Sequence, residues 1–142
     1  MTGVDYRFEG LPEQITAGTR IDFKNGSTKE VHEFVASRLP DSETRPVSDL
    51  VKLPESEAQA IFGSGPPATV LLAPPGGGET IKALGDGTLS TPGRYAVTCS
   101  IPTGADPAAF LKAVQESREG PPNAPGGPPH LAHGMFAEVR VI

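Results

Sequence analysis

The chain lacks a second cysteine, an excess of basic residues and any long apolar run. Cys99 is the only cysteine, so no internal disulfide can form and the cysteine count indicates no compartment. Lysine and arginine total 12 against 17 acidic residues, a net charge of −5. Nucleic-acid binding needs clustered basic residues, and a membrane span needs roughly 18 apolar residues in a row. We therefore expect neither nucleic acid as a partner nor a membrane span in this chain.

No signal peptide is recognisable at the start of the sequence. From this alone, the chain is expected to be either cytosolic or what remains after a targeting segment or anchor is removed. Its 142 residues suit a single domain, 1–142. Glycine (17) and proline (16) are abundant, which indicates many turns and favours an all-β fold.

Several segments alternate between apolar and polar residues with a period of two, the pattern of half-buried strands. A run of short strands with turn residues between them predicts a β-sandwich or barrel. The predicted strands are Val4 to Phe8, Arg20 to Lys24, Val31 to Leu39, Thr69 to Ala73, Glu79 to Leu84, Arg94 to Cys99 and Phe136 to Ile142.

Two helices are predicted between these strands. The first is Glu55 to Phe62, with Gly63 placed to end it. The second is Asp106 to Arg118, with Asp106 as N-cap, Pro107 at the first helical position and an apolar stripe of Phe110, Leu111 and Val114. A stretch rich in proline and glycine, 120–129, follows it and cannot be regular structure.

Soft metal ligands are scarce in this sequence, and nearly all of them lie at a strand end or in one short loop. His32 lies in a predicted strand, Cys99 ends another, and His130 and His133 stand within five residues of Met135. Met135 is in phase with the apolar face of the last strand, so its thioether should point inward. A thiolate, two imidazoles and a weak thioether select copper over hard cations, and this set is typical of an electron-transfer copper centre.

In three places the sequence resembles the cupredoxins, the blue-copper proteins that include plastocyanin and azurin. Ala17 to Gly26 is similar to their second-strand signature, with His32 following as the first ligand. Thr91 to Cys99 is similar to the strand that leads to their copper cysteine. Pro129 to Met135 is similar to their last ligand loop, with a histidine five residues before a methionine. The order His, Cys, His, Met is also the family order.

The resemblance implies a Greek-key β-sandwich that binds one copper ion through His32, Cys99, His130 and Met135. It implies a mononuclear type 1 (blue) copper protein, cycling between Cu(I) and Cu(II), that carries single electrons to a protein redox partner. It also implies an extracytoplasmic location (periplasmic, cell-surface or secreted) and electron exit through the exposed edge of the C-terminal histidine. Pro128, Pro129 and Leu131 around that histidine could form a small apolar docking patch. We expect a monomer and no enzymatic activity.

The sequence departs from the cupredoxin pattern in two places. Cys99 and His130 are 31 positions apart, where the family has only a few residues, and an insertion at about 104–127 fills the gap. Site rigidity must then come from somewhere other than a short loop, and we expect 104–127 to be largely dispensable for folding and copper binding. The second departure is Glu33, which stands where plastocyanin and azurin have an asparagine that braces the cysteine loop. The resemblance therefore does not imply this bracing here.

Three alternatives remain open at this stage. His133 competes with His130 as the ligand, although His130 has the family spacing to Met135. The protein could deliver or store copper rather than carry electrons, because the ligand set fixes the metal better than the purpose. A hydrolase with Cys99 as nucleophile has little support, because no matching nucleophile turn or oxyanion site is evident.

Overall fold

The structure is a computed structural model that describes residues 1–62, 66–77, 79–116 and 129–142. Short strands make up most of its regular structure, so the all-β prediction is confirmed at that level. The strands are β1 (Thr2–Val4), β2 (Arg7–Glu9), β3 (Gln14–Ile15), β4 (Thr19–Arg20), β5 (Lys24–Asn25), β6 (His32–Arg38), β7 (Thr69–Ala73), β8 (Ile81–Leu84), β9 (Thr88–Leu89), β10 (Gly93–Thr98) and β11 (Phe136–Val141).

Six strands form the main sheet in the order β3-β11-β10-β6-β7-β8. Strand β10 pairs antiparallel with both β6 and β11, and its last residue, Thr98, lies opposite Val35 and Phe136. The start of β6, the end of β10 and the start of β11 therefore meet at one end of the sheet. This end of the sheet, called the site end below, carries His32, Cys99 and Met135.

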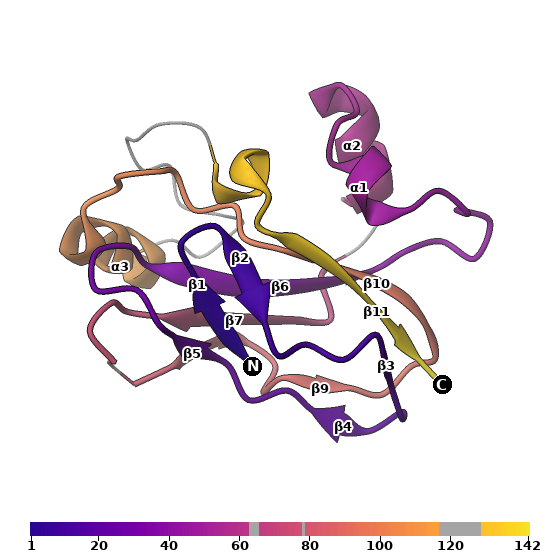
Figure 1. Cartoon of the computed structure of the whole chain (residues 1–142), viewed down its shortest axis with the longest axis horizontal. Coiled ribbons are helices and arrows are strands. Elements are labelled where there is room, and N and C mark those ends of the chain that lie inside the picture. Colours follow the sequence, from indigo (N-terminus) through magenta and orange to yellow (C-terminus); the bar gives the residue numbers. More distant parts are fainter. Residues whose placement is uncertain (63–65, 78, 117–128) are drawn as a thin grey trace.

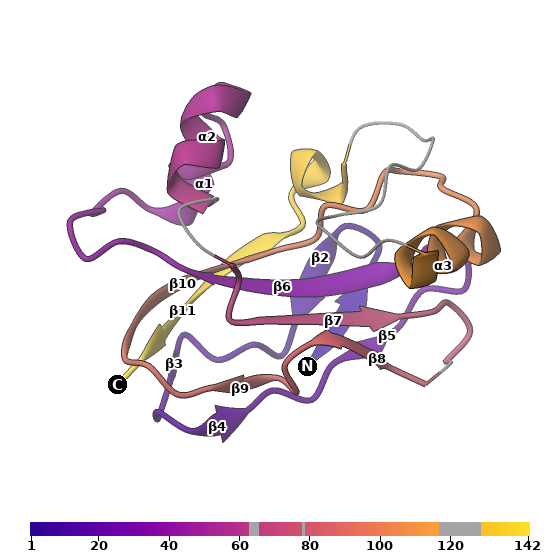
Figure 2. The ribbon, with the colours of Figure 1, turned by 180° about the vertical axis from the view of Figure 1, so that it is seen from behind.

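Two smaller sheets, β2-β1-β5 and β4-β9, lie against the main sheet (Figures 1 and 2). Strands β1 and β2 form a layer over β6 and β7, and apolar side chains from all three sheets fill the space between. The main core cluster consists of Ile15, Ile21, Phe23, Phe34, Ala36, Leu71, Ala73, Leu89, Tyr95, Val97, Val139 and Val141. Alternation along β6 and β10 points Phe34, Ala36, Tyr95 and Val97 into this core, as the sequence pattern predicts.

Two strand predictions are corrected by the structure. Val4 to Phe8 is not a single strand, because Asp5 and Tyr6 form the turn of the β1–β2 hairpin, with the Tyr6 N–H donating to the Val4 carbonyl at 2.7 Å. Arg20 to Lys24 is divided between β4 and β5, although Ile21 and Phe23 are buried as the alternation requires. The other five predicted strands match within two residues at each end.

Three α-helices and one 3-10 turn complete the described structure: α1 (Val47–Leu50), α2 (Glu55–Phe62), α3 (Pro107–Glu116) and η1 (His130–His133). Helix α3 begins as predicted, because the Asp106 carboxylate accepts a hydrogen bond from the Ala109 N–H at 3.0 Å. Gly63, Arg118 and most of the proline-rich stretch lie outside the described residues. None of the helices in the described ranges has the length and apolarity of a membrane span.

Candidate metal centre

Two of the predicted ligands are held by the main sheet. His32 opens β6 on the same face as Phe34, and Cys99 continues the inward face of Tyr95 and Val97 just beyond β10. Both side chains are fully buried. Antiparallel pairing of β6 with β10 brings them together, and the Glu33 backbone N–H donates to the Cys99 Sγ at 3.4 Å.

The other two predicted ligands come from the turn before β11. His130 begins η1, which ends at Gly134 with a φ of 102°. Glycine suits this position because its left-handed conformation is unfavourable for residues with a Cβ atom. The chain then turns inward, so Met135 is fully buried, contacts His32 and packs in one cluster with Cys99.

The three nitrogen and sulfur donors converge on one small volume. The His130 Nδ1 lies 3.2 Å from the His32 Nδ1 and 3.3 Å from the Cys99 Sγ. The three donor atoms lie within 4.8 Å of one another. Donors that share one ion at bond lengths of about 2.0 to 2.3 Å come this close.

The chemistry of the donor set fits a copper ion. In each ring Nε2 faces a carboxylate, and a histidine that donates from Nε2 keeps its lone pair on Nδ1. Two such lone pairs at 3.2 Å repel each other unless a proton or a cation lies between them. With a soft sulfur on one side and a thioether nearby, a soft or borderline cation is the best match.

Backbone pairing joins the two ends of the insertion. The His130 N–H donates to the Ile101 carbonyl at 2.9 Å, and the Leu131 N–H donates to the Cys99 carbonyl at 2.9 Å. Pro102 and Pro129 form an antiparallel bridge. The two ends of the insertion are therefore joined directly beside the site. This pairing holds Cys99 and His130 close together without a short loop between them.

Glu33 braces the cysteine loop, a role that the resemblance left open. One carboxylate oxygen, Oε1, accepts hydrogen bonds from the Ser100 N–H at 2.9 Å and the Ser100 hydroxyl at 2.7 Å. Burial raises the pKa of Glu33, while the bonds from Ser100 act in the opposite direction. The Glu33 carboxylate thus connects β6 to Ser100, the residue after the cysteine.

Burial dominates the electrostatics of the three donors. It raises the pKa of Cys99 to about 12, and the negative charge of Glu33 adds to this effect. Burial also lowers the pKa of His32, although the hydrogen bond that His32 donates to Asp5 acts in the opposite direction. Burial lowers the pKa of His130 as well, and repulsion from His32 adds to this effect. In the metal-free protein the donors are therefore a neutral thiol and two neutral imidazoles, and binding a cation through the thiolate releases a proton.

The structure separates the two C-terminal histidines. His130 is fully buried with Nδ1 among the other donors, whereas His133 is exposed. The Tyr6 ring lies between them, 5.1 Å from the His130 ring and 5.0 Å from the His133 ring. The expectation that one edge of His130 is exposed is therefore wrong, because Tyr6 and Glu30 cover the ring. Of the expected docking patch, Pro129 is exposed and Leu131 half-buried, and Pro128 lies outside the described residues.

Three side chains around the ligands were missed by the sequence reasoning: Asp5, Tyr6 and Glu30. The Asp5 carboxylate lies 3.0 Å from the His32 Nε2, and the Glu30 Oε2 lies 3.5 Å from the His130 Nε2. Asp5 and Tyr6 carried no turn signal such as Asn-Gly, so their segment was predicted as a strand. Glu30 gave only the weak signal of an acid two residues before a predicted ligand.

The first part of the insertion packs into the wall of the site. Ala105 and Phe110 are buried in the cluster that contains Cys99 and Met135. Helix α3 lies at the opposite side of the molecule from α1 and α2 (Figure 1). Leu111 is half-buried, and the side chain of Val114 lies outside the described part.

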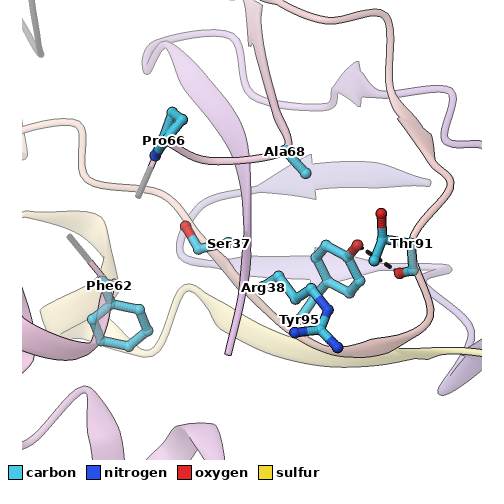
Figure 3. Close-up of a pocket in the computed structure, with 7 residues that line it drawn as sticks. All are labelled: Ser37, Arg38, Phe62, Pro66, Ala68, Thr91 and Tyr95. Carbon is cyan, nitrogen blue, oxygen red and sulfur yellow. Dashed lines mark hydrogen bonds between the residues drawn. The ribbon is translucent and has the colours of Figure 1, made fainter. Parts of the chain in front are cut away.

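The opposite end of β6 and β10, called the far end below, holds a shallow open pocket (Figure 3). Its lining includes Arg38, Phe62 and Tyr95, and the Tyr95 hydroxyl donates to the Thr91 carbonyl at 2.7 Å. Arg38 is engaged by Asp41 at 2.7 Å and by the Pro92 carbonyl at 3.0 Å. Among the described residues that line the pocket, none forms a group suited to a metal ion.

Comparison with known proteins gave no significant match. No protein-family model matches the chain, and no curated protein sequence and no solved structure matches it either.

Proposed function

We propose that this chain is a mononuclear type 1 copper protein that carries single electrons, built as a Greek-key β-sandwich of the cupredoxin type. The observation that supports this most is the convergence of His32, Cys99 and His130, all fully buried, with Met135 in contact. When bound there, copper would supply a Cu(I)/Cu(II) couple, with Cys99, His32 and His130 as strong ligands and Met135 as a weak axial ligand. We expect no enzymatic role, and a protein redox partner outside the cytoplasm.

The protein matrix favours a carrier over a delivery or storage protein. Strand pairing holds His32 and Cys99, and the bridge at Pro102 and Pro129 holds His130. Ligands that are fixed before metal binding change little in geometry between the two oxidation states, which keeps electron exchange fast. A delivery protein benefits instead from exposed and mobile ligands. The raised pKa and full burial of Cys99 also oppose a nucleophilic cysteine, which needs an exposed thiol with a lowered pKa.

A visible absorption spectrum of the copper-loaded, oxidised protein tests this proposal. Wild type should be intensely coloured through a charge-transfer band from the Cys99 thiolate to Cu(II). Cys99→Ser should lose this colour while its circular dichroism still shows a folded β protein. Weak ligand-field bands alone in copper-bound wild type would rule out the thiolate assignment. If the wild type shows the intense colour, a second measurement separates carrier from delivery. A reversible potential with fast self-exchange favours the carrier, and ready loss of Cu(I) to an acceptor favours delivery.

A further inference from the structure

Each of the two histidine ligands has a carboxylate at the edge that points away from the other donors. The Asp5 Oδ1 lies 3.0 Å from the His32 Nε2, and the Glu30 Oε2 lies 3.5 Å from the His130 Nε2. The two carboxylates come from different elements, the β1–β2 turn and the loop before β6. Both imidazoles are thus held between the common centre and a negative charge.

Glu30 is held in place by contacts that leave one oxygen for His130. Its Oε1 accepts a hydrogen bond from the Gly104 N–H at 3.0 Å, and its backbone N–H donates to the Ser27 hydroxyl at 3.0 Å. Its carbonyl accepts from the Asn25 side chain at 2.8 Å. The Oε2 atom and the His130 Nε2 are both buried, and neither has a hydrogen-bond partner among the described residues. They face each other, and a small approach would join them.

Asp5 is placed by a strained turn. Tyr6 has a φ of 83°, which is uncommon and unfavourable for a residue other than glycine. This conformation closes the β1–β2 turn tightly, with Asp5 at His32 and the Tyr6 ring against His130. Gly3 lets β1 approach this closely, because a Cβ there would lie 3.2 Å from the Met135 Cε and 3.0 Å from Phe23. The side chain of Asp5 is 43% exposed, so solvent screens its charge more than that of Glu30, which is 11% exposed.

We propose that Glu30 and Asp5 are positioning residues that orient His130 and His32 and stabilise the more highly charged state of the bound ion. The inference rests on the proposed function, and it predicts that this copper site has a low reduction potential for its ligand set. The Asp5 carboxylate accepts the Nε2–H of His32 at 3.0 Å, and the Glu30 carboxylate would accept that of His130 after a small approach. Such a bond directs the Nδ1 lone pair to the centre and makes the imidazole more basic. Each negative charge also stabilises Cu(II) more than Cu(I), because the oxidised ion has one more positive charge.

The test removes each charge with little change of shape. Glu30→Gln should favour Cu(I) over Cu(II) by roughly tenfold, which raises the reduction potential by about 59 mV. Asp5→Asn should act in the same direction by about twofold to threefold, because its charge is more screened. Glu30→Asp keeps the charge and should stay nearer to wild type than Glu30→Gln. Glu9→Gln removes a carboxylate of the same hairpin that pairs with Arg7, and serves as the control.

A second measurement separates charge from simple structural damage. Zn(II) and Cu(I) affinities of the same variants are determined by competition titration. Loss of a stabilising charge should weaken Zn(II) roughly tenfold in Glu30→Gln and weaken Cu(I) less. Equal weakening of the two ions would overturn the charge role, because general loosening of the site does not distinguish between them.

The outcomes distinguish this inference from the proposed function. A wild type without intense colour removes the electron-carrier proposal, and the Zn(II) titration then still decides the role of the carboxylates. A coloured Glu30→Gln with a potential shifted no more than Glu9→Gln overturns the inference for Glu30. If Glu30→Gln does not fold, Asp5→Asn decides: a raised potential supports the inference, and an unchanged potential overturns it.

Discussion

The two ends of the β6–β10 strand pair are both rich in polar groups but handle them differently. At the far end, charged side chains, most of them at least partly exposed, form ion pairs with one another. Arg94 meets Glu138 at 2.7 Å, Arg38 meets Asp41 at 2.7 Å, and Arg45 meets Glu43 at 2.9 Å. At the site end, His32, Cys99 and His130 are fully buried and their donor atoms point at one another.

This difference distinguishes polar clusters that are complete in themselves from one that can bind a ligand. Exposed ion pairs contribute little to stability and need no further partner. Buried donors that face each other are costly unless something binds among them. Burial, rather than the number of polar groups, therefore distinguishes the site end as the candidate metal site. The following predictions test the contrast from the largest expected effect to the smallest.

The largest effect should come from the two C-terminal histidines. His130→Ala should abolish the intense colour or convert it to the spectrum of an open site, because His130 Nδ1 lies among the donors. His133→Ala should leave the spectrum nearly unchanged. His133 is exposed, and its ring lies against Tyr6 rather than among the three donors. Absorption and electron paramagnetic resonance spectra of both variants check this. The reverse pattern would transfer the ligand role to His133.

A smaller effect should follow from removing the brace on the cysteine loop. Glu33→Ala leaves the Ser100 N–H and hydroxyl without their shared acceptor. We expect the free energy of unfolding to fall by about 1 to 3 kcal/mol, with a shifted charge-transfer band in the copper-loaded protein. Asp41→Ala removes an exposed carboxylate at the far end and should cost less than about 1 kcal/mol. Urea unfolding of the metal-free variants gives both values, and equal losses would contradict the proposed brace.

The smallest effect concerns the pH dependence of stability. The site end and the far end should lose stability in different pH ranges. Burial lowers the pKa of His32 and His130, so the unfolded chain takes up protons first and the metal-free protein loses stability as pH falls below about 6.5. At the far end, hydrogen bonds from Arg45 lower the pKa of Glu43 from 4.5 to about 2. Its contribution is present above about pH 4.5 and is lost as pH falls toward 2.

Urea unfolding of the metal-free protein from pH 8 to pH 2 measures both windows. In His130→Gln the loss below about pH 6.5 should be smaller than in wild type. In Glu43→Gln the difference from wild type should shrink only below about pH 4.5. A Glu43→Gln difference that is constant across this range would show that the ion pair with Arg45 contributes nothing.

Deletion of the insertion is now a more demanding experiment than the sequence implied. Copper binding without residues 104–127 remains a prediction, because all four proposed ligands lie outside that range. The deletion would however remove Ala105 and Phe110 from the cluster with Cys99 and Met135. It would also remove the Gly104 N–H that holds Glu30. Filling that cluster by other means would be necessary for a stable shortened protein.

The sequence by itself identified the residues proposed as metal ligands. Period-two alternation placed Cys99 on one face with Tyr95 and Val97, and the phase of the last strand placed Met135 inside. These patterns follow from local geometry, since successive side chains of a strand point to opposite faces. The Asp106 cap and Pro107 likewise predicted the start of α3, because capping depends on neighbours in the chain.

Only the tertiary structure decided which groups surround these ligands. The β1–β2 turn at Asp5 and Tyr6 depends on a positive φ that no turn motif announces. Glu30 reaches His130, and Pro102 meets Pro129, across separations of 100 and 27 positions in the chain. Burial likewise distinguishes His130, which lies among the donors, from His133, which is exposed. Such contacts depend on how three sheets and two loops pack together, and no local spacing in the sequence encodes that packing.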